Sequence, residues 1–273
     1  MTKGPSLGRI NKRRCGMAMS ALAETPVREL VSEAEWALRV ELAACYRMIA
    51  HLGWDDLVFT HISARVPGEA GHFLLNPYGL MFEEVTASSL VKLDIEGNKV
   101  LPSSYDVIPA GFTIHSAVHD ARPDAHCVIH LHTPEGVAVS CRKGGLRPVS
   151  QTALYALASI SYHPYEGVAL EADEKPRLQA DLGRAKMMIL ENHGLLTCGR
   201  SVGDAFLAMF TLQRACEVQV MAEAGGAELI EIPRAILDGI GAQVKQTLGN
   251  SGSNRVWPAV MRKMERLDSS FRE

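Results

Sequence analysis

The chain lacks two features that would connect it to membranes or to nucleic acids. None of its apolar runs is long enough to span a bilayer, and its formal net charge over 273 residues is only −3. A balance this close to neutral gives little electrostatic attraction for phosphate backbones or anionic lipids. We therefore expect a small-molecule substrate, and neither a nucleic-acid nor a membrane partner.

The chain also lacks paired cysteines, and we expect its start not to be a signal peptide. Its six cysteines show no C-x-x-C spacing, and several lie within apolar runs, which is typical of reduced proteins of the cytoplasm. The basic start, Met1 to Arg14, is not followed by the apolar segment of a signal peptide. We expect residues 1–30 to form a flexible basic arm, or a basic contact to a neighbouring subunit. Residues 31–273 are expected to form a single domain with C-terminal helices.

Histidines provide the clearest chemical pattern, since the chain has no G-x-G-x-x-G motif. In segment 126–132 three apolar residues alternate with histidine and valine, which predicts a strand with one apolar face. His130 and His132 would share the other face, roughly 7 Å apart along the strand. Thr133 and Pro134 end this strand, so the pair lies at its rim. Two solvated histidines on a polar face are the alternative to a metal site.

A second histidine at a strand end strengthens the metal hypothesis. The run Met187–Leu190 predicts a buried strand, and Glu-Asn-His-Gly follows it. The glycine, Gly194, suits a positive φ or a close approach of the backbone. Three neutral imidazoles with an open position form a catalytic rather than a structural metal site. We predict that His130, His132 and His193 bind one divalent metal, zinc first, with iron, manganese or cobalt as alternatives.

Residues 110–121 predict a helix that carries two histidines on one face. His115 and His119 are four positions apart, which is the spacing of a rival helical metal motif, but no general-base glutamate stands between them. We interpret His115 as a group that lines the pocket and His119 as a surface residue.

Two further segments have polar patterns with a structural or a chemical meaning. Ser32 and Glu35 predict a capping box at the start of the first long helix. Residues 162–167, Tyr-His-Pro-Tyr-Glu-Gly, predict a loop. Its Tyr162 and Tyr165 either serve the site or are turn residues with buried hydroxyls.

The order of the elements predicts the fold class. Strands fill the middle of the chain and helices surround them, among them residues 151–160, 175–182 and 234–248. This order is typical of a three-layer α/β/α domain. Tight turns join several strands, so the central sheet must be mixed and largely antiparallel.

Several motifs together resemble the class II aldolase/adducin family, its adducin-like branch above all. They are Arg122-Pro123-Asp124-Ala125, Val128-Ile129-His130-Leu131-His132-Thr133-Pro134 and Asn192-His193-Gly194-Leu195. The resemblance covers about Glu33 to Gly226. It implies a metal held by the three histidines, and a cyclic homotetramer with the site near a subunit interface.

The sugar-phosphate aldolases of this family differ from the chain at the residues that handle the proton and the phosphate. A glutamate nineteen positions before their first metal ligand moves the proton, and the matching residue here is Gly111. Glycine cannot accept a proton, and proline in Pro109-Ala110 has no N–H to donate to a phosphate. The remaining candidates for acid–base catalysis are His61, His115, Tyr162 and Tyr165. The matching substrate-binding residues are Thr60, His61, Tyr78 and Gly79.

Three functions are consistent with this pattern. The first is a metal-dependent aldolase-like lyase that acts on a small hydroxy- or keto-carbonyl compound. The second is a non-haem metal oxygenase on the same fold. The third is a non-catalytic, adducin-like scaffold module, although the sequence shows no long Lys-rich tail of the kind that would bundle a cytoskeleton.

Overall fold

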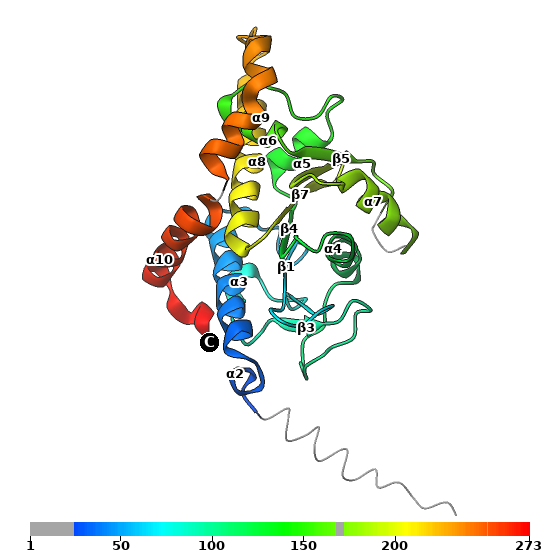
Figure 1. Ribbon diagram of the computed structural model, residues 1–273, viewed down its shortest axis with the longest axis vertical. Helices are drawn as coiled ribbons and strands as arrows, with labels where there is room; N and C mark the ends of the chain where they lie inside the picture. The colour runs from blue at the N-terminus through cyan, green and yellow to red at the C-terminus, as the bar shows by residue number, and fades with distance from the viewer. Residues whose placement is uncertain (1–24, 168–171, 250) are drawn as a thin grey trace, which may run out of the picture.

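The computed structural model describes residues 25–167, 172–249 and 251–273, which build a seven-stranded sheet between two helical layers (Figure 1). The strands are β1 (His61–Arg65), β2 (Phe73–Leu75), β3 (Val91–Leu93), β4 (Cys127–Leu131), β5 (Ile160–His163), β6 (Met187–Leu190) and β7 (Gly194–Gly199). Their order in the sheet is β3-β2-β1-β4-β7-β6-β5, and only β5 and β6 pair in parallel. The predicted three-layer α/β/α fold with a mixed, largely antiparallel sheet is confirmed.

Helices cover both faces of the sheet. Helices α3 (Glu33–His51) and α8 (Val202–Glu223) lie on one face, and α4 (Pro109–Ala121) and α7 (Lys175–Leu182) lie on the other (Figure 1). The other α-helices are α2 (Val27–Leu30), α5 (Pro134–Ser140), α6 (Gln151–Leu157), α9 (Arg234–Leu248) and α10 (Trp257–Leu267). Shorter helical turns are η1 (Phe82–Glu84), η2 (Ala172–Glu174), η3 (Gly252–Val256) and η4 (Ser269–Arg272).

The central strand β4 has the alternation that its sequence predicts. Cys127, Ile129 and Leu131 are buried in the core cluster that also contains residues of α3 and α8. Val128 points the other way, into a second cluster that includes residues of α4 and α7. Both helical layers therefore cover β4, and all five of its residues are buried. Because both faces of β4 are covered, a charged or mobile side chain can be accommodated only at the end of the strand.

Two predicted boundaries differ from the structure. The helix predicted for residues 151–160 ends at Leu157, and the predicted loop at residues 162–167 is wrong for its first two residues, which belong to β5. β5 forms because it finds a parallel partner in β6, with Tyr162 opposite Ile189. This tertiary pairing decides the conformation of a short segment whose local pattern is ambiguous.

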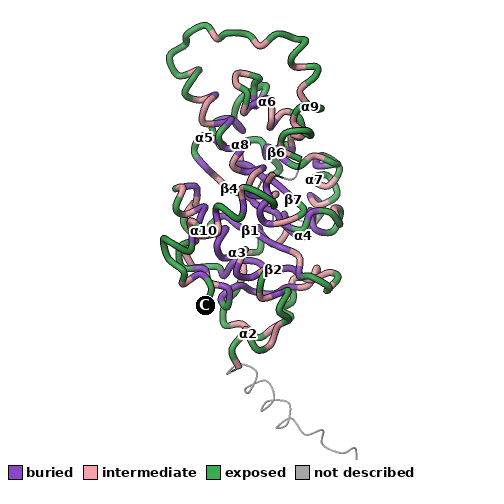
Figure 2. The backbone as a smooth tube through the Cα atoms, turned by 60° about the vertical axis from the view of Figure 1, so that its left-hand side comes forward, coloured by how far each residue is buried: buried purple, intermediate pink, exposed green. Residues whose placement is uncertain are grey.

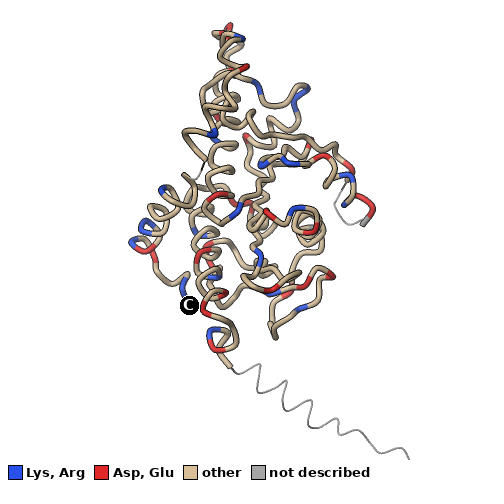
Figure 3. Tube along the Cα trace, viewed as in Figure 1, with Lys and Arg blue, Asp and Glu red and all other residues tan. Residues whose placement is uncertain are grey.

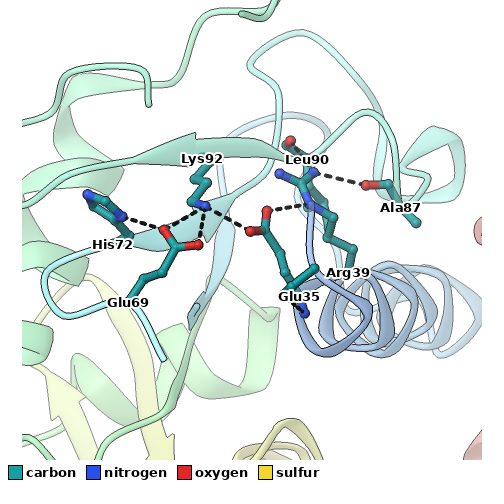
Figure 4. A network of polar contacts seen from close by, with 8 residues as sticks. Glu35, Arg39, Glu69, His72, Ala87, Leu90 and Lys92 are labelled. Carbon is teal, nitrogen blue, oxygen red and sulfur yellow. Dashed lines mark hydrogen bonds and ion pairs between the residues drawn. The ribbon is translucent and has the colours of Figure 1, made fainter. Parts of the chain in front are cut away.

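The start of α3 uses only half of the predicted capping box. The Ser32 hydroxyl accepts the N–H of Glu35 at 3.1 Å, as predicted for an N-cap. The Glu35 carboxylate does not return to Ser32. Instead it accepts hydrogen bonds from Arg39 at 2.9 Å and from Lys92 of β3 at 2.8 Å, and Lys92 also contacts Glu69 (Figure 4). This buried ion-pair network ties α3 to the far edge of the sheet.

The periphery of the molecule carries mixed charges. Lys and Arg are interspersed with Asp and Glu along the trace (Figure 3). Helix α9 has no buried residue, and this region is largely exposed (Figure 2). Within the described residues no helix is both long and apolar enough to cross a membrane. Of the predicted basic arm, residues 1–24 lie outside the described residues, and its end includes the short helix α2.

Candidate metal centre

Three histidines come together at one end of β4. His130 lies near the end of that strand, His132 follows it, and His193 lies in the turn between β6 and β7. β7 pairs with β4, with Leu195 opposite Leu131, so the turn lies beside the end of β4. The ring centroids are 4.7 Å apart for His130–His132 and for His130–His193, and 4.9 Å apart for His132–His193. One ligand nitrogen from each ring lies within 4.8 Å of the other two.

The hydrogen bonds of two of these rings fix where their protons are. His130 Nδ1 lies 3.0 Å from the carbonyl oxygen of Leu195, and His132 Nδ1 lies 3.0 Å from a carboxylate oxygen of Asp56. Both acceptors lack a proton to give, so each Nδ1 is the N–H donor and Nε2 is the ring nitrogen that faces another partner. The two Nε2 atoms lie 2.9 Å apart. A divalent cation bound there would be shared by both Nε2 atoms.

Backbone geometry keeps the turn close to β4. Asn192 has a φ of 56°, and its N–H donates to a carbonyl of α5 at 3.1 Å. A Cβ atom at Gly194 would lie 2.5 Å from the carbonyl oxygen of Leu131. Of the two reasons predicted for this glycine, close approach is the one found. At the end of β4, the Thr133 hydroxyl caps α5 and donates to Gln213 of α8.

Burial keeps the His130 and His193 imidazoles neutral. It lowers the pKa of His130 well below the usual 6.5, and the neighbouring histidines add to this shift. Burial also lowers the pKa of His193 to about 4. Neutral imidazole is the form that binds metals, and an acceptor on the second ring nitrogen is the usual support of a metal-binding histidine. The donor set of His130, His132 and His193 therefore fits one divalent ion with an open position.

His61 extends this cluster onto β1. It lies opposite His130 in the antiparallel pair β1–β4, and the two rings stack with centroids 6.0 Å apart. Helix α4 passes over His61, and a Cβ atom at Gly111 would lie 2.5 Å from His61 Cδ2. The His61 ring therefore fills the space that a side chain at position 111 would need. Neither of its ring nitrogens has a hydrogen-bond partner, although both are buried.

Behind His61, two histidines of α4 share the hydroxyl of Ser63. His115 Nδ1 lies 2.6 Å and His119 Nε2 lies 2.7 Å from Ser63 Oγ. The prediction that His119 is a surface residue is wrong, since its side chain is 1% exposed. The face of α4 that carries it packs on β1. His115 is fully buried beside His61 rather than on an open pocket wall, with ring centroids 5.7 Å apart.

The predicted tyrosines lie apart from this cluster. The Tyr162 hydroxyl accepts a backbone N–H at 3.1 Å. Together with Asn192, Tyr162 lines a cavity of about 620 Å³ next to the turn that carries His193. Tyr165 is 54% exposed and Tyr78 is 47% exposed. Among the described residues, no ring contact joins these tyrosines to the three histidines.

The remaining predicted substrate-binding residues divide between two places. Thr60 directly precedes His61, and its hydroxyl oxygen is buried without a partner. Gly79 lies in the turn after β2 with a φ of 99°. A second cavity, of about 640 Å³, lies between α8 and α9, and none of the three histidines lines it.

Sequence reasoning missed three polar residues around the cluster. Asp56 lies in a turn far along the chain from its partner, and no local pattern could have found it. Ser63 is two positions from a histidine on the same strand, so strand alternation is a usable signal for it. His163, at the end of β5, is 2% exposed and lies 2.7 Å from Asp181 and 3.5 Å from Glu174.

Comparison with known proteins gives a consistent result. Residues 40–220 match the family described as Class II Aldolase and Adducin N-terminal domain. A Pseudomonas aeruginosa protein, provisionally named as an aldolase class 2 protein, is 58% identical over 260 residues, which cover 93% of this chain and all of that protein. Alpha-adducin of Mus musculus is 46% identical over 228 residues, which cover 78% of this chain but 31% of that protein.

Solved structures show the same relationship. An aldolase II superfamily protein from Pseudomonas syringae superposes with a TM-score of 0.85 at 46% identity, over 91% of this chain and all of that chain. An L-fuculose 1-phosphate aldolase from Glaciozyma antarctica superposes with a TM-score of 0.76 at 26% identity, over 93% of this chain and 99% of that chain.

Proposed function

We propose, from the premise that this chain belongs to the class II aldolase and adducin family, that it is a metal-dependent lyase. Its substrate would be a small hydroxy- or keto-carbonyl compound whose carbon–carbon bond is cleaved. His130, His132 and His193 would hold the metal, zinc first, with iron, manganese or cobalt as alternatives.

The contact between His130 Nε2 and His132 Nε2 carries this proposal. Each ring already donates its Nδ1–H to a fixed acceptor, and the two Nε2 atoms lie 2.9 Å apart. A metal ion bound to both Nε2 atoms would complete the usual pattern of a metal-binding histidine, whose second ring nitrogen holds a fixed acceptor. His193 brings a third imidazole, neutral through burial, to the same point. A divalent metal bound there would polarise vicinal oxygen atoms of the substrate as a Lewis acid.

The surrounding residues would orient the substrate and handle its proton. His61 is the nearest candidate, because its ring lies beside His130 and has two unpartnered nitrogens. Thr60, with an unpartnered buried hydroxyl, is a second polar contact. Tyr162 would act only on a substrate that extends into the cavity beside His193. Tyr165, with more than half of its surface exposed, would likewise act only on a substrate that extends as far as its loop.

Cleavage of a sugar phosphate is not the activity that these residues favour. Gly111 offers no proton acceptor, and the ring of His61 fills the space in which a glutamate side chain would start. Pro109 has no N–H for a phosphate oxygen. The proposal is therefore a family lyase with altered substrate and proton chemistry.

We also propose that the chain forms a cyclic homotetramer in the cytoplasm, with the site near a subunit junction. The family resemblance supports this assembly. Light scattering of a dilute sample should report a tetramer. A stable monomer at micromolar concentration would count against the proposed location of the site.

A non-catalytic, adducin-like module is the second candidate. The identity to alpha-adducin and the glycine at position 111 favour it. A metal oxygenase on the same fold is a third option, which oxygen uptake by the iron-loaded protein would reveal.

One assay separates these candidates. Zinc-loaded protein is incubated with a panel of small hydroxy- and keto-carbonyl compounds, and the aldehyde products are measured with and without a chelator. Oxygen uptake is measured on iron-loaded protein with the same panel. A lyase should release product from at least one compound, and the chelator should abolish the release. Absence of chelator-sensitive release and of oxygen uptake across the panel would favour the non-catalytic module.

A further inference from the structure

The hydrogen bonds behind His61 have only one consistent direction. A carbonyl oxygen only accepts, so His119 donates its Nδ1–H to Ala125 at 3.1 Å and keeps a lone pair on Nε2. The Ser63 hydroxyl must then donate to this lone pair, at 2.7 Å. Its oxygen accepts the Nδ1–H of His115 at 2.6 Å. His115 is left with a lone pair on Nε2, which is buried and has no partner.

His61 is the group that complements this lone pair. The rings of His115 and His61 meet edge to face, with centroids 5.7 Å apart and an interplanar angle of 85°. Both nitrogens of His61 are buried and unpartnered. A neutral imidazole carries one N–H and one lone pair, and in a buried position each of them needs a partner. The N–H of His61 is satisfied if the His61 ring turns it toward the lone pair on His115 Nε2.

The second nitrogen of His61 then has a defined character. If the N–H is committed to His115, the other nitrogen is an acceptor. The centroids of the His61 and His130 rings are 6.0 Å apart, so the His61 ring would bring this acceptor next to the metal centre. Gly111 allows the ring to occupy this position, because any side chain there would collide with it.

We propose that Ser63, His115 and His119 are positioning residues that fix the tautomer of His61, so that His61 presents a lone pair to a ligand at the metal centre. This inference rests on the proposed metal site. It defines the ligand class as a small α-hydroxy carbonyl compound or α-hydroxy acid, whose hydroxyl donates to His61. A fully ionised phosphate group, which only accepts hydrogen bonds, meets a repulsive lone pair at the same place.

The tautomers are tested on the protein alone. Histidine labelled with ¹⁵N reports directly which ring nitrogen carries the proton, in metal-free and zinc-loaded protein at pH 7. His115 and His119 should both be protonated on Nδ1. Ser63→Ala should release His115 from this single tautomer. Thr197→Val removes another buried strand hydroxyl, which donates to Ala205 at 3.2 Å, and should leave both tautomers unchanged. A wild-type His115 protonated on Nε2 would overturn the proposal.

The ligand class is tested with glycolate and acetate, which differ by one hydroxyl. Calorimetry on zinc-loaded protein gives the ratio of their dissociation constants, which includes chelation of the metal by glycolate. Ser63→Ala should lower the preference for glycolate by about three- to tenfold, the usual effect of one hydrogen bond. Thr197→Val should keep the wild-type ratio, and zinc content should be equal in all three proteins.

A second variant interrupts the same series of hydrogen bonds at another residue, so the test does not depend on the folding of Ser63→Ala alone. His119→Phe removes the acceptor of the Ser63 hydroxyl and should reduce the glycolate preference by a similar factor. Wild-type preference in both Ser63→Ala and His119→Phe would overturn the proposal. If wild-type protein binds no zinc, the lyase proposal fails, and the ¹⁵N measurement still decides whether the hydrogen-bond chain has the stated direction.

Discussion

Alanine at position 111 tests the contact between α4 and His61. A Cβ atom there would lie 2.5 Å from His61 Cδ2 and 2.6 Å from His61 Nε2, distances that real structures do not show. Because both groups are buried, the ring or the helix must move, and such overpacking typically costs about 1–3 kcal/mol. The higher helix propensity of alanine offsets about 1 kcal/mol of this cost. Gly111→Ala should therefore lower the free energy of unfolding by up to about 2 kcal/mol.

A matched glycine in another helix provides the control. Gly239 lies within α9, and a Cβ atom there would meet nothing within 4 Å. Gly239→Ala should therefore stabilise the protein by about 0.5–1 kcal/mol. In a His61→Ala background the penalty of Gly111→Ala should disappear, which gives a coupling of about 1–3 kcal/mol in urea unfolding. If Gly111→Ala stabilises the wild type as Gly239→Ala does, the packing of His61 against α4 is refuted.

Three further outcomes are expected. Glu35→Gln should cost about 3–5 kcal/mol in urea unfolding, because it leaves buried Arg39 without its carboxylate and Lys92 with Glu69 as its remaining one. Glu33→Gln, at an exposed pair, should have little effect, and equal effects would contradict this account. Burial lowers the pKa of His119 from 6.5 to about 3, so between these pH values the unfolded state binds a proton that the folded state does not. Stability should therefore fall as the pH drops from 6.5 to 3, by about 1.4 kcal/mol per pH unit from this group. His119→Gln should remove this contribution to the slope, and an unchanged slope would show that His119 is not buried neutral. The protein should lack appreciable L-fuculose 1-phosphate cleavage activity, and Gly111→Glu should not create it. Loss of general acid–base catalysis lowers a rate by about 10²–10⁴-fold. A high native cleavage rate that a chelator abolishes would show that another residue takes the role of the glutamate.

Local patterns predicted the elements that carry the three histidines. The alternation along β4 depends on neighbours two positions apart, and the turn at His193 depends on a strand run followed by Asn-His-Gly. Ser201 caps α8 by accepting the N–H of Asp204, and serine is a preferred N-cap residue. In each case the residues that decide the structure lie within a few positions of one another, so a single sequence contains the signal.

Contacts between distant segments could not be predicted in this way. The burial of His119 depends on which face of α4 meets β1, and its helical periodicity leaves that open. The ring of His61 fills the space beside Gly111, and these two residues are 50 positions apart in the chain. Only the packing of the strand against the helix reveals this contact. β5 likewise depends on its parallel partner β6. Helix and strand patterns thus locate the site, whereas packing defines its chemistry.

Metal content measured by mass spectrometry on dialysed, purified protein tests the central claim most directly. The wild type should hold about one divalent ion per chain, since three imidazoles with an open position bind a single ion. His132→Ala should lose the ion, whereas His115→Ala should keep it, because His115 bonds to Ser63 and not to the cluster. Full metal content in His132→Ala, or loss of metal in His115→Ala, would contradict the assignment of His130, His132 and His193 as the ligands.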